Sequence, residues 1–574
     1  MSDNGADGLS SEAVTQLNQA VTFHQQGRLV EAEALYRAIL IGQPRHFDAL
    51  QLLGAAVNQR GDHAQAVRLI LEALSIQPNH AVAHYNCGAA LLAMNRLDEA
   101  LAQFDQAIAL RPTHVGAMNN RATTLMMLGR PAQALEELDR ALASQQDNAA
   151  VLANRAAVLF ELKRFSEALA DADRALALHP DNPFTLYNRA NVLKDLNRLD
   201  EALADYDRAL RIKPDYVEAL INRGILLVDL RRLDEALDSY GRALALDPNR
   251  ASARLNAGLC RLLGGDFPRG WDLYEARWHN EPLVHQKRDF AAPRWFGGGD
   301  LSGKTLFVYA EQGIGDTIQF CRLVAQACPP SGRIVLEVQP ALKPLLEVFD
   351  GVTEVIAQGD PLPEFDAHCP LLSLAPALGI TVDTIPARVP YISPPPAKND
   401  AWAAKLGALG RPRVGLAWSG SPALKNDRNR SISLEKFAPL LRVCKTLVSL
   451  QKDIRPDEAS WLAAHPEVPH FGSELQDFSD TAALIGQVDL VISVDTAVAH
   501  LAGAMGKPVW ILLPYVGCDW RWMLNRADSS WYPTARLFRQ ARPGDWESVI
   551  SQLISALAAR TEDCPQCPDN EGLV

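Results

Sequence analysis

A proline recurs every 34 residues through the first half of the chain, and this period constrains the fold more than any other feature. The series is Pro44, Pro78, Pro112, Pro180, Pro214, Pro248 and Pro282, with Gln146 at the one remaining position. Such a period is typical of helical hairpins stacked into a solenoid, in which each hairpin buries its apolar face against its neighbours. We therefore expect about eight hairpins over residues 14–282.

Each predicted hairpin has a small residue at one position and, four residues later, a residue that is usually larger. The small residues are Ala32, Ala66, Ala100, Ala134, Ala168, Ala202 and Ala236. The residues four positions later are Tyr36, Ile70, Phe104, Leu138, Ala172, Tyr206 and Tyr240. Small residues let paired helices approach closely, and the larger ones fill the space between hairpins. The last unit has Gly270 in place of the alanine. Its bulky Trp271, Tyr274 and Trp278 lead us to expect that it docks onto another domain.

These units resemble the tetratricopeptide repeat, most plainly in residues 198–214 and 232–248. The resemblance implies an α-solenoid with a concave surface that holds a protein or a peptide. The alternative is that the array serves only as a spacer or an oligomerisation arm.

An asparagine also recurs with the repeats, at Asn120, Asn154, Asn188 and Asn222, and each is followed by an arginine. A row of side-chain amides on one inner helix face could bind the backbone of a peptide acceptor. Equally, these amides could close hydrogen bonds between neighbouring repeats. Both interpretations stay open at this stage.

After Pro282 the period stops, and apolar runs alternate with helical segments. In a first lobe, residues 283–396, strands are expected at 305–310, 333–338 and 352–356. In a second lobe, residues 397–560, strands are expected at 413–418, 446–450, 490–494 and 509–513. This alternation predicts doubly wound parallel sheets, with ligands in a cleft between the carboxyl ends of their strands. The proline-rich residues 392–396 suit a hinge between the lobes.

Composition narrows the function classes. The formal charge of −12 argues against nucleic-acid binding by bulk electrostatics. Residues 1–13 show no secretory signal and are expected to be disordered, and no apolar run reaches the roughly 18 residues of a membrane span. Nine scattered cysteines indicate reduced thiols, and the lone Cys564–Cys567 pair in the polar tail 561–574 is not expected to bind metal. We expect a soluble, bacterial-type cytoplasmic protein without a metal or other cofactor, with peripheral membrane association left open.

Three segments of the second half concentrate polar groups where strands end. They contribute Gly313, Gly315 and Asp316; Lys425, Arg428 and Arg430; and Asp495, Thr496, Ala497 and His500. In the third segment a strand ends at Asp495–Thr496 and Ala497 opens a helix, with His500 one turn beyond Thr496. The unpaired N–H groups and the dipole of a helix start favour an anion such as a pyrophosphate.

The first and third segments resemble the heptosyltransferase-like glycosyltransferases of family 9, which have the GT-B fold of two facing Rossmann-like lobes. The matching residues are Gly313, Gly315, Asp316, Val494, Asp495, Thr496, His500, Leu501, Ala502, Ala504, Gly506 and Pro508. The resemblance covers roughly residues 304–557, and Ala497 stands where the family usually has glycine. The overall plan is similar to that of protein O-linked N-acetylglucosamine transferases, which also join such repeats to a GT-B region.

The resemblance implies a nucleotide-sugar donor on the second lobe and an acceptor on the first. Thr496, the N–H groups from Ala497 onward and His500 would hold the donor pyrophosphate. Asp495 is expected to cap the helix or to hold the turn, because a carboxylate beside phosphate is repelled. The basic loop, with Lys425, Arg428 and Arg430, would offset the charge of the leaving group, as a metal does elsewhere; it could also simply be solvated.

Asp316 would be the general base of an inverting displacement, with Glu311 as the reserve candidate. The alternative for Asp316 is an ordinary helix cap. Trp520 belongs to an aromatic cluster that would suit a sugar or a nucleobase, although ordinary packing explains it equally well.

The leading hypothesis is a metal-independent glycosyltransferase whose repeats hold a polypeptide acceptor. The alternatives are transfer to a glycan or lipid-linked acceptor, with the repeats recruiting a partner, and a repeat scaffold whose transferase fold has lost activity. A decayed site should have lost its polar residues, yet Asp316, Asp495 and His500 are all present. This favours the enzyme.

Overall fold

The computed structural model describes residues 11–299, 301–328, 331–424 and 426–562. The chain divides into two compact units, one up to Ala219 and one from Leu220. Most of the segment predicted to be disordered and most of the polar tail, with Cys564 and Cys567, lie outside the described residues. The first helix nevertheless begins at Ser11, so residues 11–13 are helical rather than disordered.

The first unit is built from helical hairpins, as the period predicts. Its helices are α1 (Ser11–Gln25), α2 (Leu29–Gly42), α3 (Phe47–Gln59), α4 (His63–Ile76), α5 (Ala81–Ala93), α6 (Leu97–Leu110), α7 (Val115–Met127), α8 (Pro131–Ser144), α9 (Ala149–Glu161), α10 (Phe165–Leu178), α11 (Pro183–Asp195) and α12 (Leu199–Ile212). The prolines of the series from Pro44 to Pro248 come two residues after the second helix of a hairpin ends, as Pro44 does after α2. A proline cannot continue a helix, so it marks the end of each hairpin.

The alternation of small and large residues sets how closely the paired helices pack. The recurring alanines, Ala32 to Ala236, are all completely buried, which confirms the prediction. In the second and third hairpins the larger partner faces a glycine on the first helix. A Cβ at Gly54 would lie 2.5 Å from Ile70 Cγ1, and one at Gly88 would lie 2.7 Å from the Phe104 ring. These glycines therefore make room for the large side chain of the neighbouring helix.

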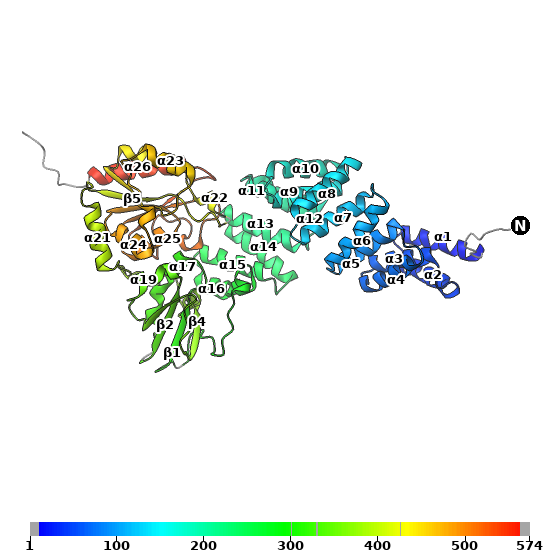
Figure 1. Ribbon diagram of the computed structural model, residues 1–574, viewed down its shortest axis with the longest axis horizontal. Coiled ribbons are helices and arrows are strands. Elements are labelled where there is room, and N and C mark those ends of the chain that lie inside the picture. The colour runs from blue at the N-terminus through cyan, green and yellow to red at the C-terminus, as the bar shows by residue number, and fades with distance from the viewer. Residues whose placement is uncertain (1–10, 300, 329–330, 425, 563–574) are drawn as a thin grey trace, which may run out of the picture. The chain divides into compact units, whose positions relative to one another are not determined.

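The second unit begins within the repeats. Its helical part comprises α13 (Val217–Asp229), α14 (Leu233–Leu246), α15 (Ala251–Leu263), α16 (Phe267–Tyr274) and the 3-10 helices η1 (Glu275–His279) and η2 (Leu283–His285). Figure 1 shows α15 and α16 beside α17 of the following lobe. The Trp271 indole donates a hydrogen bond to the carbonyl of Ile380 (2.9 Å), and Trp278 packs in one cluster with Phe307. The last unit therefore docks on the α/β region, as its aromatic residues predicted.

The N-terminal lobe contains one parallel sheet of order β3-β2-β1-β4. Its strands are β1 (Thr305–Tyr309), β2 (Arg333–Val338), β3 (Glu354–Ala357) and β4 (Ala367–Pro370). Its helices are α17 (Ile314–Phe320), η3 (Cys321–Leu323), α18 (Val324–Ala327), η4 (Pro340–Leu342), α19 (Lys343–Leu346), η5 (Leu371–Ser373) and α20 (Leu374–Ala377). Sequence analysis did not predict β4, because it is short and ends in a proline.

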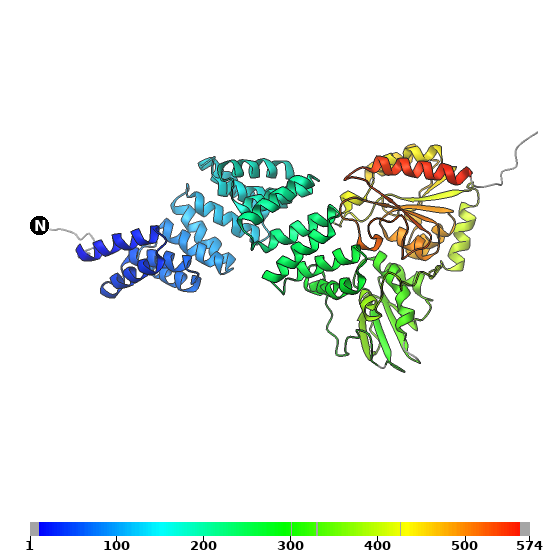
Figure 2. The same cartoon turned by 180° about the vertical axis from the view of Figure 1, so that it is seen from behind.

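The C-terminal lobe contains a second parallel sheet, of order β6-β5-β7-β8-β9. Its strands are β5 (Arg413–Ala417), β6 (Thr446–Ser449), β7 (Leu490–Val494), β8 (Val509–Leu513) and β9 (Ala535–Arg539). Its helices are α21 (Pro396–Leu406), α22 (Asp427–Arg430), η6 (Leu434–Arg442), α23 (Pro456–Ala464), η7 (Gly472–Glu474), α24 (Phe478–Gly486), α25 (Ala497–Ala504), η8 (Trp520–Trp522) and α26 (Trp546–Glu562). Figure 2 shows α26, in red, on the outer side of this lobe. The proline-rich stretch expected as a hinge leads into α21, whose first residue is Pro396.

The strand order places the candidate site. In the second sheet β5 has β6 on one side and β7 on the other, so β5 and β7 are neighbours although β6 lies between them in sequence. The order in which the chain adds strands to the sheet therefore reverses at β5. Ligands of open α/β sheets bind outside the carboxyl ends of strands at such a reversal. The loop before α22 follows β5, and Asp495–Thr496 follows β7. Among the described helices, none has both the length and the apolar character needed to cross a membrane.

Candidate functional site

The two turns that the sequence singled out lie against each other. α17 of the N-terminal lobe packs on α25 of the C-terminal lobe, and Gly315 is at the contact. A Cβ at this position would lie 2.9 Å from His500 Cδ2 and 3.6 Å from the Cα of Ala497. Gly315 is therefore needed for the close approach of the two helices. Gly313 precedes α17 and serves as its N-cap.

Asp316 has two partners. Its Oδ2 accepts a hydrogen bond from the Gly313 N–H at 2.9 Å, so it does cap the start of α17. Its Oδ1 pairs with the guanidinium of Arg521 from the C-terminal lobe. Burial raises the pKa of the Asp316 carboxyl, and the charge of Arg521 opposes that rise. The cap is thus present, and the other oxygen lies beside a buried cation where the two lobes meet.

Arg521 is the charged residue that sequence analysis missed. Its guanidinium is buried, and besides Asp316 it bonds Asp519 (3.0 Å) and the side-chain oxygen of Gln319 (2.5 Å). Sequence analysis treated residues 519–522, Asp-Trp-Arg-Trp, only as an aromatic cluster. The signal was available, because an arginine that stands between two tryptophans after a strand is expected to be buried with a charged partner.

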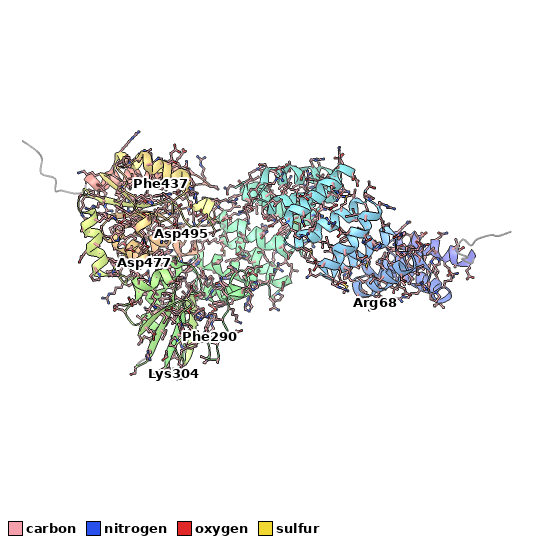
Figure 3. All side chains as sticks on the ribbon, in the orientation of Figure 1. Arg68, Phe290, Lys304, Phe437, Asp477 and Asp495 are labelled. Atoms are coloured by element: carbon pink, nitrogen blue, oxygen red, sulfur yellow. The ribbon has the colours of Figure 1, made fainter. Side chains whose placement is uncertain are left out.

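Asp495 lies at the end of β7, on the side of its lobe that is nearer to the N-terminal lobe (Figure 3). Of its two expected roles, capping α25 or holding the turn, capping is not observed, because the N-cap is Thr496; Asp495 Oδ1 lies 3.9 Å from His500 Nε2. Burial raises the pKa of the Asp495 carboxyl, and the like charge of Asp519 raises it further. Protonation is therefore easier than for an ordinary aspartate, which reduces repulsion of a nearby anion.

The start of α25 has unpaired donors. Thr496 has an extended backbone, and its hydroxyl makes no cap hydrogen bond but lies 3.2 Å from Ser493 Oγ. Its carbonyl accepts the N–H of Ala499 at 3.0 Å. No hydrogen bond joins the N–H of Ala497 or Val498 to a residue that the structure describes. These two N–H groups are therefore available as hydrogen-bond donors, and the predicted anion site stays a prediction.

The basic loop reaches this turn through Arg430. Its Nη1 donates a hydrogen bond to the carbonyl of Asp495 at 3.0 Å, and its Nε pairs with Asp427 at 3.3 Å. Arg428 lies on α22 and is exposed. Lys425 lies outside the described residues. Of the two predicted cations that the structure describes, Arg430 thus reaches the Asp495–Thr496 turn.

His500 is a neutral residue in this site. It is 6% exposed, its Nδ1 lies 3.0 Å from the Tyr532 hydroxyl, and its ring stacks on Trp522 with centroids 5.3 Å apart. Burial lowers the pKa of the His500 imidazole to about 3, and the charge of Arg521 contributes. His500 can therefore offer a hydrogen bond to a phosphate but not a positive charge.

Glu311 is not a suitable reserve base. Its side chain is only 2% exposed and is ion-paired with Arg277 of η1 at 3.0 Å. The N–H of Leu372 donates to the same carboxylate at 3.3 Å. Burial raises the pKa of Glu311 to about 6 although Arg277 opposes the rise. This residue therefore ties the last repeat to the carboxyl end of β1, and we correct its predicted role.

Trp520 is also better explained by packing. The residue is 5% exposed, and its ring lies 5.2 Å from that of Trp271, with an interplanar angle of 87°. Phe267, Phe320 and Trp531 complete the same cluster. Its faces are covered by these rings, so the structure assigns Trp520 to the docking of the last repeat rather than to donor contact.

The repeated asparagines are partly exposed, and one of them makes a hydrogen bond between repeats. The amide nitrogen of Asn154 on α9 donates to the side-chain oxygen of Asn119 on α7 at 2.9 Å. The arginines that follow have a clear structural role. Arg155 pairs with Asp171 in its own hairpin (2.6 Å) and with Asp139 in the preceding one (2.7 Å).

The series of asparagines is longer than sequence analysis recognised. Residues spaced by multiples of 34 from Asn120, Asn154, Asn188 and Asn222 include Asn18, Asn86 and Asn256. The second hairpin has Leu52 at this position. The 34-residue spacing by itself predicts these further positions.

Comparison with known proteins supports this organisation. Tetratricopeptide-repeat families match residues 17–81, 57–109, 91–158, 149–182, 183–216 and 217–250. Residues 476–512, which contain β7 and α25, match glycosyltransferase family 9 (heptosyltransferase). The chain thus combines tetratricopeptide repeats with a C-terminal α/β region that carries a family 9 segment, and this supports a glycosyltransferase.

A curated relative and solved structures were also found. Protein FlbA of Caulobacter vibrioides is 32% identical over 320 residues, which cover 51% of this chain and 52% of FlbA. The chain therefore spans about half the length of this relative. The Cut9–Hcn1 hetero-tetramer of APC/C is 21% identical, with a TM-score of 0.39, over 47% of this chain and 54% of that chain. A tetratricopeptide repeat protein from Parabacteroides merdae is 16% identical, with a TM-score of 0.38, over 44% of this chain and 99% of that chain.

Proposed function

We propose that this protein transfers a sugar from a nucleotide-sugar donor to an acceptor, with the repeats holding a polypeptide acceptor. The observation that carries the proposal is the contact between the two turns. Gly315 of one lobe lies against Ala497 and His500 of α25 in the other, and α25 belongs to the segment that matches glycosyltransferase family 9. This contact supports a site in which Asp316 would be the base and the start of α25 would bind the anion.

The donor would bind through its diphosphate at the start of α25. The hydrogen-bond donors at this helix start are the N–H groups of Ala497 and Val498 and the hydroxyl of Thr496. Arg430 supplies a positive charge next to the turn. Arg521 is a second cation nearby, and it is buried. Positive charges placed in advance stabilise the charge that develops on a departing nucleoside diphosphate. We therefore propose a reaction that requires no metal.

Asp316 would then act on the acceptor. An acceptor hydroxyl oxygen bonds to the anomeric carbon as the bond from that carbon to the diphosphate breaks, with inversion at carbon. The hydroxyl proton passes to Asp316, and the nucleoside diphosphate leaves with the electron pair. Burial supports this role because it raises the pKa of the Asp316 carboxyl towards the range of a useful base.

The test is a screen of nucleoside diphosphate sugars against the wild-type protein and Arg430→Ala. We expect at least one donor to bind the wild type by calorimetry and to release its nucleoside diphosphate when acceptor is added. Arg430→Ala should weaken that binding about tenfold, since a charged hydrogen bond is lost. If no donor binds the wild-type protein, the proposal is wrong.

A further inference from the structure

A turn of the seventh repeat lies against the C-terminal lobe. α13 ends at Asp229, and its carboxylate accepts a hydrogen bond from the N–H of Gly517 at 2.9 Å. Arg231, in the same turn, donates to the carbonyl of Gln540 at 3.3 Å and lies 4.5 Å from the Tyr515 ring centroid. Figures 1 and 2 show α13 close to α22 of that lobe. The repeat thus holds the loop that follows β8 at two points.

Gly517 also contacts the loop that precedes α22. Its carbonyl accepts a hydrogen bond from the side chain of Asn426 at 2.9 Å. The φ angle of Gly517 is +68°, a region that favours glycine, and a Cβ here would overlap the Asn426 amide. Gly517 is therefore enclosed between Asp229 of the repeat and Asn426 of the lobe, and no larger residue fits without displacing one of them.

Asn426 in turn positions α22. It is the N-cap residue of this helix, and its side-chain oxygen accepts a hydrogen bond from Asn429 at 2.7 Å. α22 carries Arg430, whose guanidinium reaches the carbonyl of Asp495 at 3.0 Å. Hydrogen bonds therefore connect Asp229, Gly517 and Asn426, and the short helix α22 then connects Asn426 to Arg430, which bonds the carbonyl of Asp495.

The seventh repeat differs in this respect from the repeat before it. Asp195 occupies the same position in α11 as Asp229 does in α13, 34 residues earlier. The aspartate is thus a shared feature of two repeats, whereas the contact with Gly517 is made by Asp229. A matched pair of variants can therefore separate the effect of this contact from the effect of an aspartate at that repeat position.

From these contacts we propose that Asp229 is a positioning residue for the donor site. By holding Gly517 it sets the position of Asn426, and thereby the position of Arg430 on α22, which would face a nucleoside diphosphate. The inference rests on the proposed function for the identity of the ligand. The contact itself is independent of that function, so the two can be tested apart.

The first test measures nucleotide affinity. UDP, GDP, ADP and CDP are titrated by calorimetry into the wild type, Asp229→Ala, Asp229→Asn and Asp195→Ala. Asp229→Ala should lower the affinity for whichever nucleotide binds the wild type about tenfold, because the N–H of Gly517 loses a charged acceptor. Asp229→Asn should stay within about twofold, since its amide oxygen can still accept that hydrogen bond. Asp195→Ala should match the wild type. Equal affinity of Asp229→Ala and wild type would overturn the positioning role.

The second test needs no nucleotide. Hydrogen–deuterium exchange of the backbone from Asn426 to Ser431 should be faster in Asp229→Ala than in the wild type, Asp229→Asn or Asp195→Ala. Unchanged exchange in Asp229→Ala would contradict the inference whatever the nucleotides do. If exchange is faster in Asp229→Ala but the wild type binds none of the four nucleotides, the role of Asp229 in positioning α22 is supported and the proposed function is overturned.

A further variant, Asn426→Ala, tests the same contact independently in case Asp229→Ala does not fold. Asn426→Ala removes the other hydrogen bond of Gly517 and should weaken nucleotide binding to a similar extent. If both residues act through Gly517, the double variant should lose no more affinity than the worse single variant. Losses that simply multiply in the double variant would show that Asp229 does not act through Asn426.

Discussion

The carboxylate of Asp316, in the first turn of α17, is paired with the guanidinium of Arg521, in η8 of the other lobe. The two residues are 205 positions apart. Arg521 also bonds Asp519, so a single buried cation lies between a carboxylate of each lobe. This arrangement links the proposed base to the proposed donor side and leads to the first two predictions.

Arg521→Gln should impair both stability and turnover. Removing one member of a buried ion pair leaves an uncompensated charge, which typically costs about 3 kcal/mol of unfolding free energy. Without the cation, the pKa of Asp316 should rise further, and the acid limb of the pH–rate profile should move to higher pH. Transfer rates from pH 5 to 9 and thermal unfolding measure these effects. Arg542→Gln is the control, because the Arg542 side chain is 81% exposed; an unshifted acid limb in Arg521→Gln would contradict the assignment.

Asp316→Asn should distinguish the role of Asp316 as a helix cap from its proposed role as a base. The amide oxygen of asparagine can still accept the N–H of Gly313, so α17 should keep its start and the donor should bind within about twofold. The amide cannot take up the acceptor proton, and the transfer rate should fall at least about a hundredfold. Calorimetry and steady-state kinetics provide the two numbers. Full activity with normal donor binding would show that Asp316 is only a cap.

His500 should make the second unit sensitive to acid. The pKa of its imidazole is about 3 in the folded protein, below the ordinary value of 6.5. A lowered pKa contributes stability that is present above pH 6.5 and is lost as the pH falls towards 3, because the unfolded chain binds the proton first. At pH 4.5 the loss amounts to about 2–3 kcal/mol.

His500→Gln should remove that part of the pH dependence. All 11 tryptophans lie in the second unit, so tryptophan fluorescence in urea reports on its unfolding alone. Between pH 7 and pH 4.5 the wild type should lose more stability than the variant does. Parallel losses in both proteins would mean that His500 is not a buried neutral residue.

Glu311→Gln should lower the thermal stability of the second unit and leave the transfer rate nearly unchanged. The variant weakens the pairing with Arg277 that ties the last repeat to β1, so the thermal midpoint of the second unit should fall. Donor affinity and the transfer rate should stay within about threefold of the wild type once the protein is folded. A loss of rate as large as that of Asp316→Asn would restore Glu311 as a catalytic candidate.

The asparagine series should matter for the acceptor. Asn188→Ala should slow transfer to polypeptide acceptors while changing the thermal midpoint little, because a partly exposed amide contributes about 1 kcal/mol or less to folding. Asn154→Ala should also cost some stability, since Asn154 bonds Asn119 of another repeat. Arg155→Gln is the contrasting variant: it breaks two ion pairs and should destabilise the array. A large stability loss in Asn188→Ala would favour a purely structural role.

Much of the fold could be predicted because its signals are local. The strands at residues 333–338, 490–494 and 509–513 have the predicted bounds, since a buried parallel strand appears as a continuous apolar run. β4 and β9 were missed because Ala367–Pro370 ends in proline and Ala535–Arg539 carries two arginines. Neither departs from the parallel sheets that were expected, but neither shows the apolar run that reveals a buried strand.

The sequence by itself determined the 34-residue hairpins, the alternation of strands and helices, and the two turns at Asp316 and Asp495. These follow from helix periods, proline positions and apolar runs, each of which acts over a few neighbouring residues. Only the tertiary structure decided how distant charges pair and what burial does to them. It joined Arg521 to Asp316, committed Glu311 to Arg277, covered Trp520 with aromatic rings and left His500 neutral. Pairing and desolvation depend on which surfaces meet, and no local pattern carries that information.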